Sequence, residues 1–189
     1  RNIAALTTIG GEKRDFLLMV KANAYGHGLI PCAELAASLG ARFVGVVDLM
    51  EARRLRDSGF PAPILLFPGA VDATLDEARL LDVTVVVDTV KRLREAAAFA
   101  ARRGPVAVHL EFDTGLHRGG LSGIDLSVIA EILRTAPNLR GEGAMCHPSN
   151  AGDDDRRTIE EQRRFHELLH DLGHAAEWAP HWVHTENSA

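Results

Sequence analysis

The sequence lacks several features that would place a protein in a class at once. It has two cysteines, one tyrosine and three lysines, and no apolar run approaches the ~20 residues of a membrane-spanning helix. Cys32 and Cys146 lie far apart in apolar segments, which favours reduced thiols over a disulfide and predicts a cytoplasmic protein. A net charge of -5 offers no basic face to nucleic acid. Neither a GxGxxG stretch nor a P-loop occurs, so nucleotide-binding α/β folds lose support.

Short apolar runs, which predict strands, alternate regularly along the chain with segments of helical periodicity, which predict helices. The expected strands are 16–20, 42–47, 63–67, 83–87, 106–112, 141–145 and one beginning at 182, and the expected helices are 2–9, 29–39, 50–57, 72–81, 90–102, 126–135 and 158–172. Strands apolar on both faces imply a parallel sheet. A (β/α)8 barrel typically needs about 250 residues. We therefore expect residues 1–189 to be one incomplete α/β barrel domain of about seven βα units, with the last unit missing.

Lys21 differs from the other lysines because it directly follows the apolar run 16–20. Lys13 and Lys91 lie in polar or charged segments and are expected to be solvated. A lysine at the edge of a core can lose water around its ammonium group, which lowers its pKa and makes the amine nucleophilic. The alternative is a strand-end lysine that extends into solvent. The nearby hydroxyl of Tyr25 favours a ligand site.

Residues 20–28, VKANAYGHG, resemble the cofactor motif of the alanine racemases, barrel enzymes that depend on pyridoxal 5'-phosphate (PLP). Nine consecutive matching residues make the resemblance specific. It implies that Lys21 binds PLP as a Schiff base and that the hydroxyl of Tyr25 binds the cofactor phosphate. It also implies a TIM-type barrel that a C-terminal β domain follows in the complete protein.

The stretch 111–120, EFDTGLHRGG, resembles the family's DTGMxRxG motif. The resemblance implies that Arg118 interacts with the phenolic oxygen of the cofactor and with the substrate carboxylate. A planar guanidinium suits a carboxylate, because it offers two parallel donors. Taken without the resemblance, Arg118 could equally be a solvent-exposed loop residue.

Glu111 stands on a strand that is otherwise apolar. A buried carboxylate is costly unless a cation pairs with it, so Glu111 needs a partner if it is buried. The position of Glu111 resembles one that, in many alanine racemases, is a lysine carrying a carbamate, which holds the catalytic arginine in place. We therefore predict that Glu111 orients the side chain of Arg118 without itself contacting the ligand. A solvent-facing glutamate is the alternative.

Two later stretches complete the resemblance. Residues 146–150, CHPSN, resemble the family's T-H-F-x-x-A segment loosely, which implies that His147 packs flat on the cofactor ring. A histidine after a strand is otherwise more often structural. Residues 184–189, HTENSA, resemble H-x-x-N-S-A, which implies that Asn187 lies beside the cofactor and that Ser188 contacts its phosphate.

A competing motif is HELLH at 166–170, which fits the zinc-protease signature H-E-x-x-H. Helical geometry favours a structural reading, with the histidines at the edge of an apolar stripe. That stripe consists of Phe165, Leu168, Leu169 and Leu172. We expect no metal site here. The stretch 153–157, DDDRR, is read as a solvated loop and helix start.

With the resemblance, these residues predict a PLP-dependent racemase that interconverts L-alanine and D-alanine by α-proton abstraction and supplies D-alanine for cell-wall synthesis. The family implies a homodimer in which a tyrosine of the partner subunit is the second base. Because Tyr25 is assigned to the phosphate, residues 1–189 alone are expected to be inactive. The alternatives are a broad-specificity or serine racemase of the same fold, or a non-catalytic PLP-binding protein.

Overall fold

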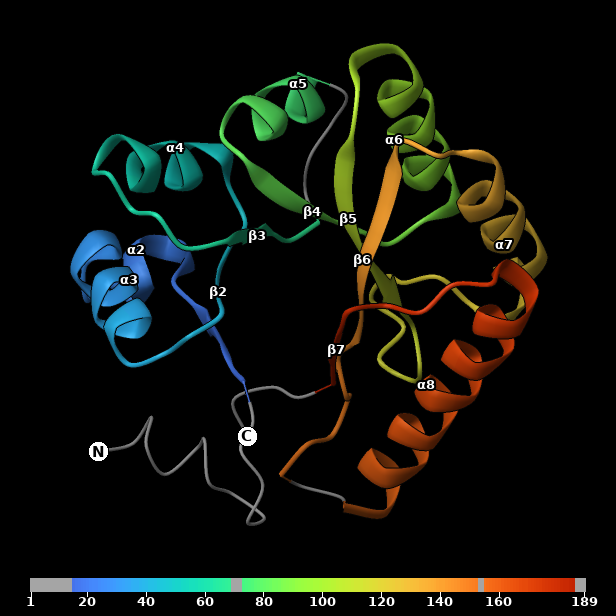
Figure 1. The fold of residues 1–189 in the computed structure, drawn as a ribbon. Coiled ribbons are helices and arrows are strands. Elements are labelled where there is room, and N and C mark those ends of the chain that lie inside the picture. Colours follow the sequence, from blue (N-terminus) through green and yellow to red (C-terminus); the bar gives the residue numbers. More distant parts are fainter. Residues whose placement is uncertain (1–14, 69–72, 153–154, 186–189) are drawn as a thin grey trace. The chain divides into compact units, whose positions relative to one another are not determined.

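The computed structural model describes residues 15–68, 73–152 and 155–185. Strands and helices alternate along this part of the chain, and they form two compact units, residues 1–85 and 86–189 (Figure 1). The helix predicted at 2–9 lies outside the described residues. No helix in the described ranges is both long and apolar enough to cross a membrane.

The first unit contains parallel strands that pair in chain order. The strands are β1 (Leu17–Met19), β2 (Phe43–Val46), β3 (Ile64–Leu66) and β4 (Val83–Val87). The helices are α2 (Lys21–Tyr25), α3 (Leu29–Ser38), α4 (Leu49–Asp57) and α5 (Ala73–Leu80). Strands β2 and β3 are buried along their whole length, as continuous apolar runs in a parallel sheet should be. Leu29 of α3 and Leu55 of α4 belong to the same buried cluster as Val44 and Ile64.

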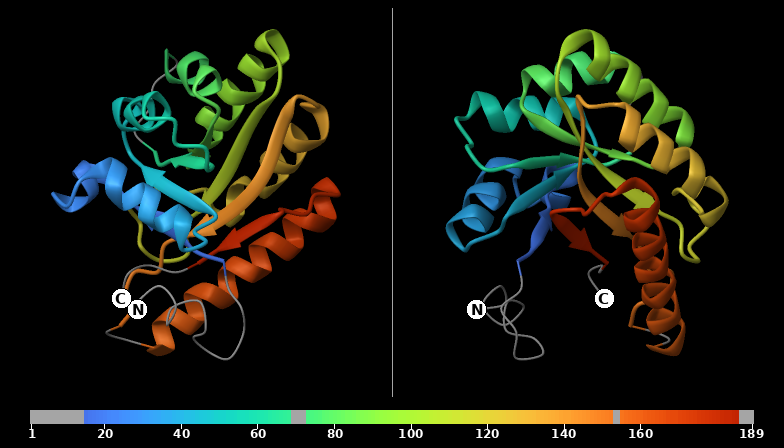
Figure 2. Two further views of the ribbon diagram at one scale, coloured as in Figure 1. Left: turned by 60° about the vertical axis from the view of Figure 1, so that its left-hand side comes forward. Right: turned by 45° about the vertical axis from the view of Figure 1, so that its right-hand side comes forward.

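The second unit is likewise parallel, with β5 paired to β6 and β6 to β7. Its elements are α6 (Val90–Arg103), β5 (Val106–Phe112), the 3-10 turn η2 (Gly123–Asp125), α7 (Leu126–Thr135), β6 (Leu139–Cys146), α8 (Asp155–Ala176) and β7 (Trp182–His184). Helices α6, α7 and α8 lie on one side of these strands (Figure 2). The register of β5 and β6 shifts after Val108, where Glu142 is an extra residue in β6. This bulge places His109 opposite Gly143.

Helix α8 shows how an amphipathic sequence fixes its own orientation. Phe165 and Leu172 are fully buried, and the ring of Phe165 lies 5.9 Å from the ring of Phe112 on β5. His166 and His170 are exposed on the same helix. Leu168 and Leu169 are half-buried, so the predicted apolar stripe is confirmed with Phe165 and Leu172 as its most buried members.

Both cysteines are free thiols, as predicted. Cys146 is buried at the end of β6, and burial raises the pKa of its thiol to about 11. Cys32 is half-buried on α3. A thiol with so high a pKa is poorly nucleophilic, which makes Cys146 a packing residue.

Candidate functional site

Lys21 lies directly after β1, at the start of a turn whose backbone is left-handed. Val20 before it is fully buried, Lys21 is half-buried, and Tyr25 is 64% exposed. The four residues 22–25 have φ between 53° and 55°. This conformation costs a non-glycine residue about 1–2 kcal/mol. Strain of this kind gathers at functional sites, and the sequence pattern had not indicated it.

Two side chains hold the left-handed turn in place. The Oδ1 of Asn23 accepts a hydrogen bond from the N–H of Leu29 at 3.0 Å, at the start of α3. Glu51 of α4 accepts from the N–H of Asn23 at 3.3 Å and from the N–H of Val47 at 3.4 Å. Glu51 thereby ties the lysine turn to the end of β2. Sequence reasoning missed both residues, although asparagine is one of the few residues that tolerate a left-handed backbone.

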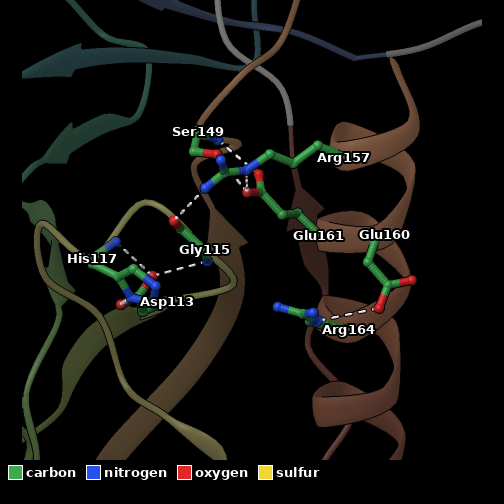
Figure 3. A network of polar contacts seen from close by, with 8 residues as sticks. All are labelled: Asp113, Gly115, His117, Ser149, Arg157, Glu160, Glu161 and Arg164. Atoms are coloured by element: carbon green, nitrogen blue, oxygen red, sulfur yellow. Dashed lines mark hydrogen bonds and ion pairs between the residues drawn. The ribbon is translucent and has the colours of Figure 1, made fainter. Parts of the chain in front are cut away.

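The loop after β5 carries Arg118 and is ordered by Asp113. The Oδ1 of Asp113 accepts hydrogen bonds from the N–H groups of Gly115 and His117, each at 3.0 Å (Figure 3). Burial acts to raise the pKa of Asp113, but the hydrogen bonds from His117 and Gly115 outweigh it and lower that pKa. The loop is therefore held in one conformation, and it presents Arg118 in an exposed position.

Glu111 is only 8% exposed, so it does not face solvent. Burial and the nearby charge of Asp88 raise the pKa of its carboxyl, and the positive charge of Arg118 acts in the opposite direction. Among the described residues, the carboxylate has no hydrogen bond and no ion pair within 4.0 Å, Arg118 included. The carboxylate of Glu111 is therefore buried, as its predicted role requires. The charge of Arg118 acts on it from more than 4.0 Å away.

His147 lies after β6, next to the buried Cys146, and is half-buried. Two residues further on, the N–H of Ser149 donates to the Oε2 of Glu161 on α8 at 2.7 Å. The sequence reasoning had not singled out Glu161, which is 2% exposed. The available signal was its place one helical turn before Phe165, on the buried stripe of α8.

The charged stretch at 153–157 needs a correction at its last residue. Helix α8 begins at Asp155, so the predicted helix start is right. Arg157, however, is not simply solvated, because its Nε donates to Glu161 at 3.1 Å and its Nη2 donates to the carbonyl of Gly115 at 3.3 Å.

His184, the first residue of the HTENSA stretch, contacts a second histidine. Its Nε2 lies 3.0 Å from the Nδ1 of His109 on β5. Burial, together with the charge of its neighbour, lowers the pKa of His109 to about 3, and burial lowers that of His184 to about 4. Both imidazoles are therefore neutral at pH 7. Asn187 and Ser188 lie outside the described residues.

The remaining predicted groups are placed as follows. Lys91 is 86% exposed in its side chain and pairs with Glu95 on the surface of α6, as a solvated lysine should, and Lys13 lies outside the described residues. His166 and His170 line an open surface hollow on α8. Within the described ranges, no group of three or more metal-ligating side chains lies close enough to hold an ion.

Known proteins resemble this chain along its whole length. The domain family described as "Alanine racemase, N-terminal domain" matches residues 1–189. The alanine racemase of Xanthomonas oryzae is 39% identical over 157 residues, which are 82% of this chain and 41% of that relative. The alanine racemase of Frankia casuarinae is 34% identical over 193 residues, which cover 100% of this chain and 50% of the relative. The chain thus spans about half the length of these relatives.

Solved structures agree. The alanine racemase of Streptomyces coelicolor superimposes with a TM-score of 0.88 at 29% identity, covering 99% of this chain and 51% of that one. A structure from Bacillus anthracis with bound L-Ala-P gives a TM-score of 0.87 at 28% identity, covering 99% of this chain and 49% of that one. The fold is therefore the parallel (β/α) barrel of these proteins, to which the described residues contribute seven strands, as the sequence predicted. The chain belongs to the alanine racemase N-terminal domain family.

Proposed function

We propose that this chain is the cofactor-binding part of a PLP-dependent alanine racemase. The observation that carries the proposal is the strained, left-handed turn 22–25, which directly follows Lys21 and contains Tyr25, the chain's one tyrosine. Strain is retained where function requires it. Within the family, an amine and a phenolic hydroxyl at these two positions serve the cofactor.

The donor set of this chain fits PLP group by group. The amine of Lys21 suits the aldehyde, and the hydroxyls of Tyr25 and Ser188 suit the phosphate. The guanidinium of Arg118 suits the phenolic oxygen and the carboxylate of an amino acid. When PLP is bound, His147 would pack on the ring and Asn187 would lie beside it, as the resemblance implies. When bound, PLP supplies an electron sink for the charge that remains on the α-carbon after proton loss.

The proton chemistry belongs to protein groups. Lys21 Nζ serves one face of the substrate α-carbon, and racemisation needs a second base on the opposite face. The resemblance implies that the second base is a tyrosine, and Tyr25, the one tyrosine of residues 1–189, is assigned to the phosphate, so we propose that this base lies outside these residues. The family points to a tyrosine of a partner subunit, so we propose a homodimer. We also propose a cytoplasmic location, which the two free thiols support, and a role in supplying D-alanine to the cell wall.

The role of Lys21 is tested by trapping the cofactor on the protein. Borohydride added to the full-length protein with PLP should fix the cofactor to the peptide that contains Lys21. Lys21→Ala should lose the label, whereas Lys91→Ala should keep it, because Lys91 lies exposed on α6. Peptide mapping by mass spectrometry identifies the modified residue. A label on Lys13 or Lys91 would contradict the assignment.

The substrate is tested by α-proton exchange in the full-length protein. Alanine should exchange its α-proton with deuterium from solvent faster than serine or larger amino acids do. Comparable exchange with several amino acids would indicate a broad-specificity racemase. PLP bound at Lys21 without exchange would indicate a cofactor-binding protein that has no turnover.

A further inference from the structure

Glu161 is a carboxylate on the buried face of a helix. It occupies the stripe of α8 that continues with Phe165, Leu172 and Ala176, and it is 2% exposed. A charge at such a position is costly unless it is paired and hydrogen-bonded. Packing alone would favour an aliphatic residue here. We therefore expect the carboxylate of Glu161 to have a role other than filling the core.

Both oxygens of Glu161 are engaged, by Ser149 from the segment after β6 and by Arg157 one turn earlier on α8 (Figure 3). The Oε2 accepts the N–H of Ser149 at 2.7 Å, and the Oε1 accepts the hydroxyl of Ser149 and the Nε of Arg157 at 3.1 Å. Burial opposes ionisation, but the hydrogen bonds from Ser149 and the charge of Arg157 lower the pKa of Glu161. The group is a fixed anion at pH 7.

The same pair of side chains reaches the loop after β5. The Nη2 of Arg157 donates to the carbonyl of Gly115 at 3.3 Å. A Cβ atom on Gly115 would lie 2.3 Å from the Oε1 and 2.9 Å from the Cδ of Glu161, so a larger residue would force the loop and the carboxylate apart. Figure 3 shows Gly115 and Ser149 on the two sides of the Arg157 and Glu161 pair.

The two tethered segments each carry a predicted site residue. Gly115 precedes Arg118 by three positions, and Ser149 follows His147 by two. Both segments leave from paired strand ends, because Phe112 of β5 lies opposite Cys146 of β6. One ion pair on α8 therefore holds the backbone of both segments.

Other ion pairs on α8 provide a natural comparison. Glu160, next in sequence, pairs with Arg163 at 2.7 Å and with Arg164 at 3.3 Å, and its side chain is 42% exposed. Exposed helical pairs of this kind contribute little. Glu160 differs from Glu161 in being more exposed and in pairing along its own helix, whereas Glu161 also binds Ser149 outside α8.

We propose that Glu161 and Arg157 are positioning residues that tie the Arg118 loop to the His147 segment and so set the place where the substrate carboxylate binds. This rests on the proposed function only for the identity of the ligand. The connection that Glu161 and Arg157 make between the two segments is a property of the fold, and it can be tested without measuring enzyme activity.

The first test measures backbone protection by hydrogen–deuterium exchange in the full-length apoprotein. Glu161→Gln keeps the shape and removes the charge, so peptides covering 113–121 and 147–152 should both exchange faster. The matched control, Glu160→Gln, should leave both unchanged. Unchanged exchange in Glu161→Gln, or faster exchange in one segment only, overturns the tie.

The second test asks whether the tie serves ligand binding. Propionate, a carboxylate without an amino group, is titrated into the PLP-loaded full-length protein and followed by the cofactor's visible absorbance. Glu161→Gln should weaken propionate binding and raise the KM for alanine about tenfold to a hundredfold, with a smaller change in kcat and in PLP content. Glu160→Gln should match the wild type. Equal effects of the two variants, or loss of PLP without a change in propionate binding, overturn the positioning role.

Arg157→Lys covers the case in which Glu161→Gln does not fold. It keeps a cation beside Glu161 but removes the second donor that reaches Gly115, so the 113–121 peptide should exchange faster and propionate should bind more weakly. A wild-type result for both measurements overturns the proposal. If wild-type protein exchanges no amino acid α-proton, the proposed function fails, while the exchange experiment on the apoprotein still decides the tie.

Discussion

Glu111 and Glu161, the buried carboxylates in the described part of the second unit, have opposite electrostatic surroundings. Glu161 has hydrogen-bond donors on both oxygens and a lowered pKa. Glu111 has a raised pKa, because it is buried near Asp88 and Asp113 and only Arg118 offsets their charge. A carboxyl with a raised pKa takes up a proton more readily and is common at functional sites. At the scale of single residues, Glu161 is therefore suited to a fixed structural role, whereas the effect of the Glu111 charge on Arg118 is a matter for experiment.

Replacing Glu111 tests its predicted influence on Arg118. Glu111→Gln keeps the shape and removes the charge, so turnover of the full-length enzyme should fall while PLP stays bound. The wild type should lose activity on the acid side as Glu111 takes up its proton, and the variant should lack this acid limb. Steady-state racemisation across pH measures both effects.

The control for this experiment is Glu131→Gln, at an exposed position on α7, which should behave as the wild type. Loss of PLP with normal turnover per bound cofactor would assign Glu111 to packing instead. An acid limb that persists in Glu111→Gln would show that another group is responsible for it.

At the scale of elements, the sequence was sufficient to predict the bounds of strands and helices wherever these depend on local periodicity. The strands 83–87 and 106–112 and the helix 126–135 have the predicted bounds, because apolar runs and apolar stripes lead directly to buried faces. The left-handed turn after β1 could not be found in this way. Its backbone is fixed by Glu51, 28 residues away from Asn23, and no local pattern encodes that contact. The place of Glu161 on the buried stripe of α8 is a local signal, but its contact with Ser149, 12 residues away, is not encoded by any local pattern.

The left-handed turn leads to a prediction about Asn23. Asn23→Ala should destabilise the full-length apoprotein by about 1–2 kcal/mol, because it removes the hydrogen bond to Leu29 and leaves a Cβ in a left-handed backbone. Asn23→Gly loses the same hydrogen bond but adopts this backbone without steric cost, so it should destabilise less. Urea denaturation of both variants measures the difference. Equal losses would indicate that the backbone strain is negligible.

At the scale of the whole molecule, stability sums over every group whose pKa differs between the folded and unfolded states. Asp113 and Glu161 have lowered pKa values, so they stabilise the fold above the usual carboxyl pKa, and this is lost as the pH falls through their folded values. His109 and His184 affect the stability at higher pH than these carboxylates do. Their folded pKa values of about 3 and about 4 lie well below the ordinary value of 6.5.

The sign for the two histidines follows from proton counting. Below about pH 6.5 the unfolded chain binds protons at both imidazoles, whereas the folded protein binds them only near pH 3 and pH 4. Stability should therefore fall as the pH drops from about 6.5 toward 4, with a slope of up to about 1.4 kcal/mol per pH unit for each histidine. Urea unfolding of the full-length apoprotein at several pH values measures this slope.

Substitution of one histidine separates this pair from the other titrating groups. His184→Gln retains a polar side chain that cannot titrate, so about half of the slope assigned to the pair should disappear. It also removes the like charge that contributes to the low pKa of His109, so His109 should protonate at a somewhat higher pH. His166→Gln is the control, because His166 is exposed on α8 and its substitution should leave the slope unchanged. A slope equal to that of the wild type in His184→Gln would mean that other groups govern the acid response, and that the contact between β5 and β7 does not depend on neutral imidazoles.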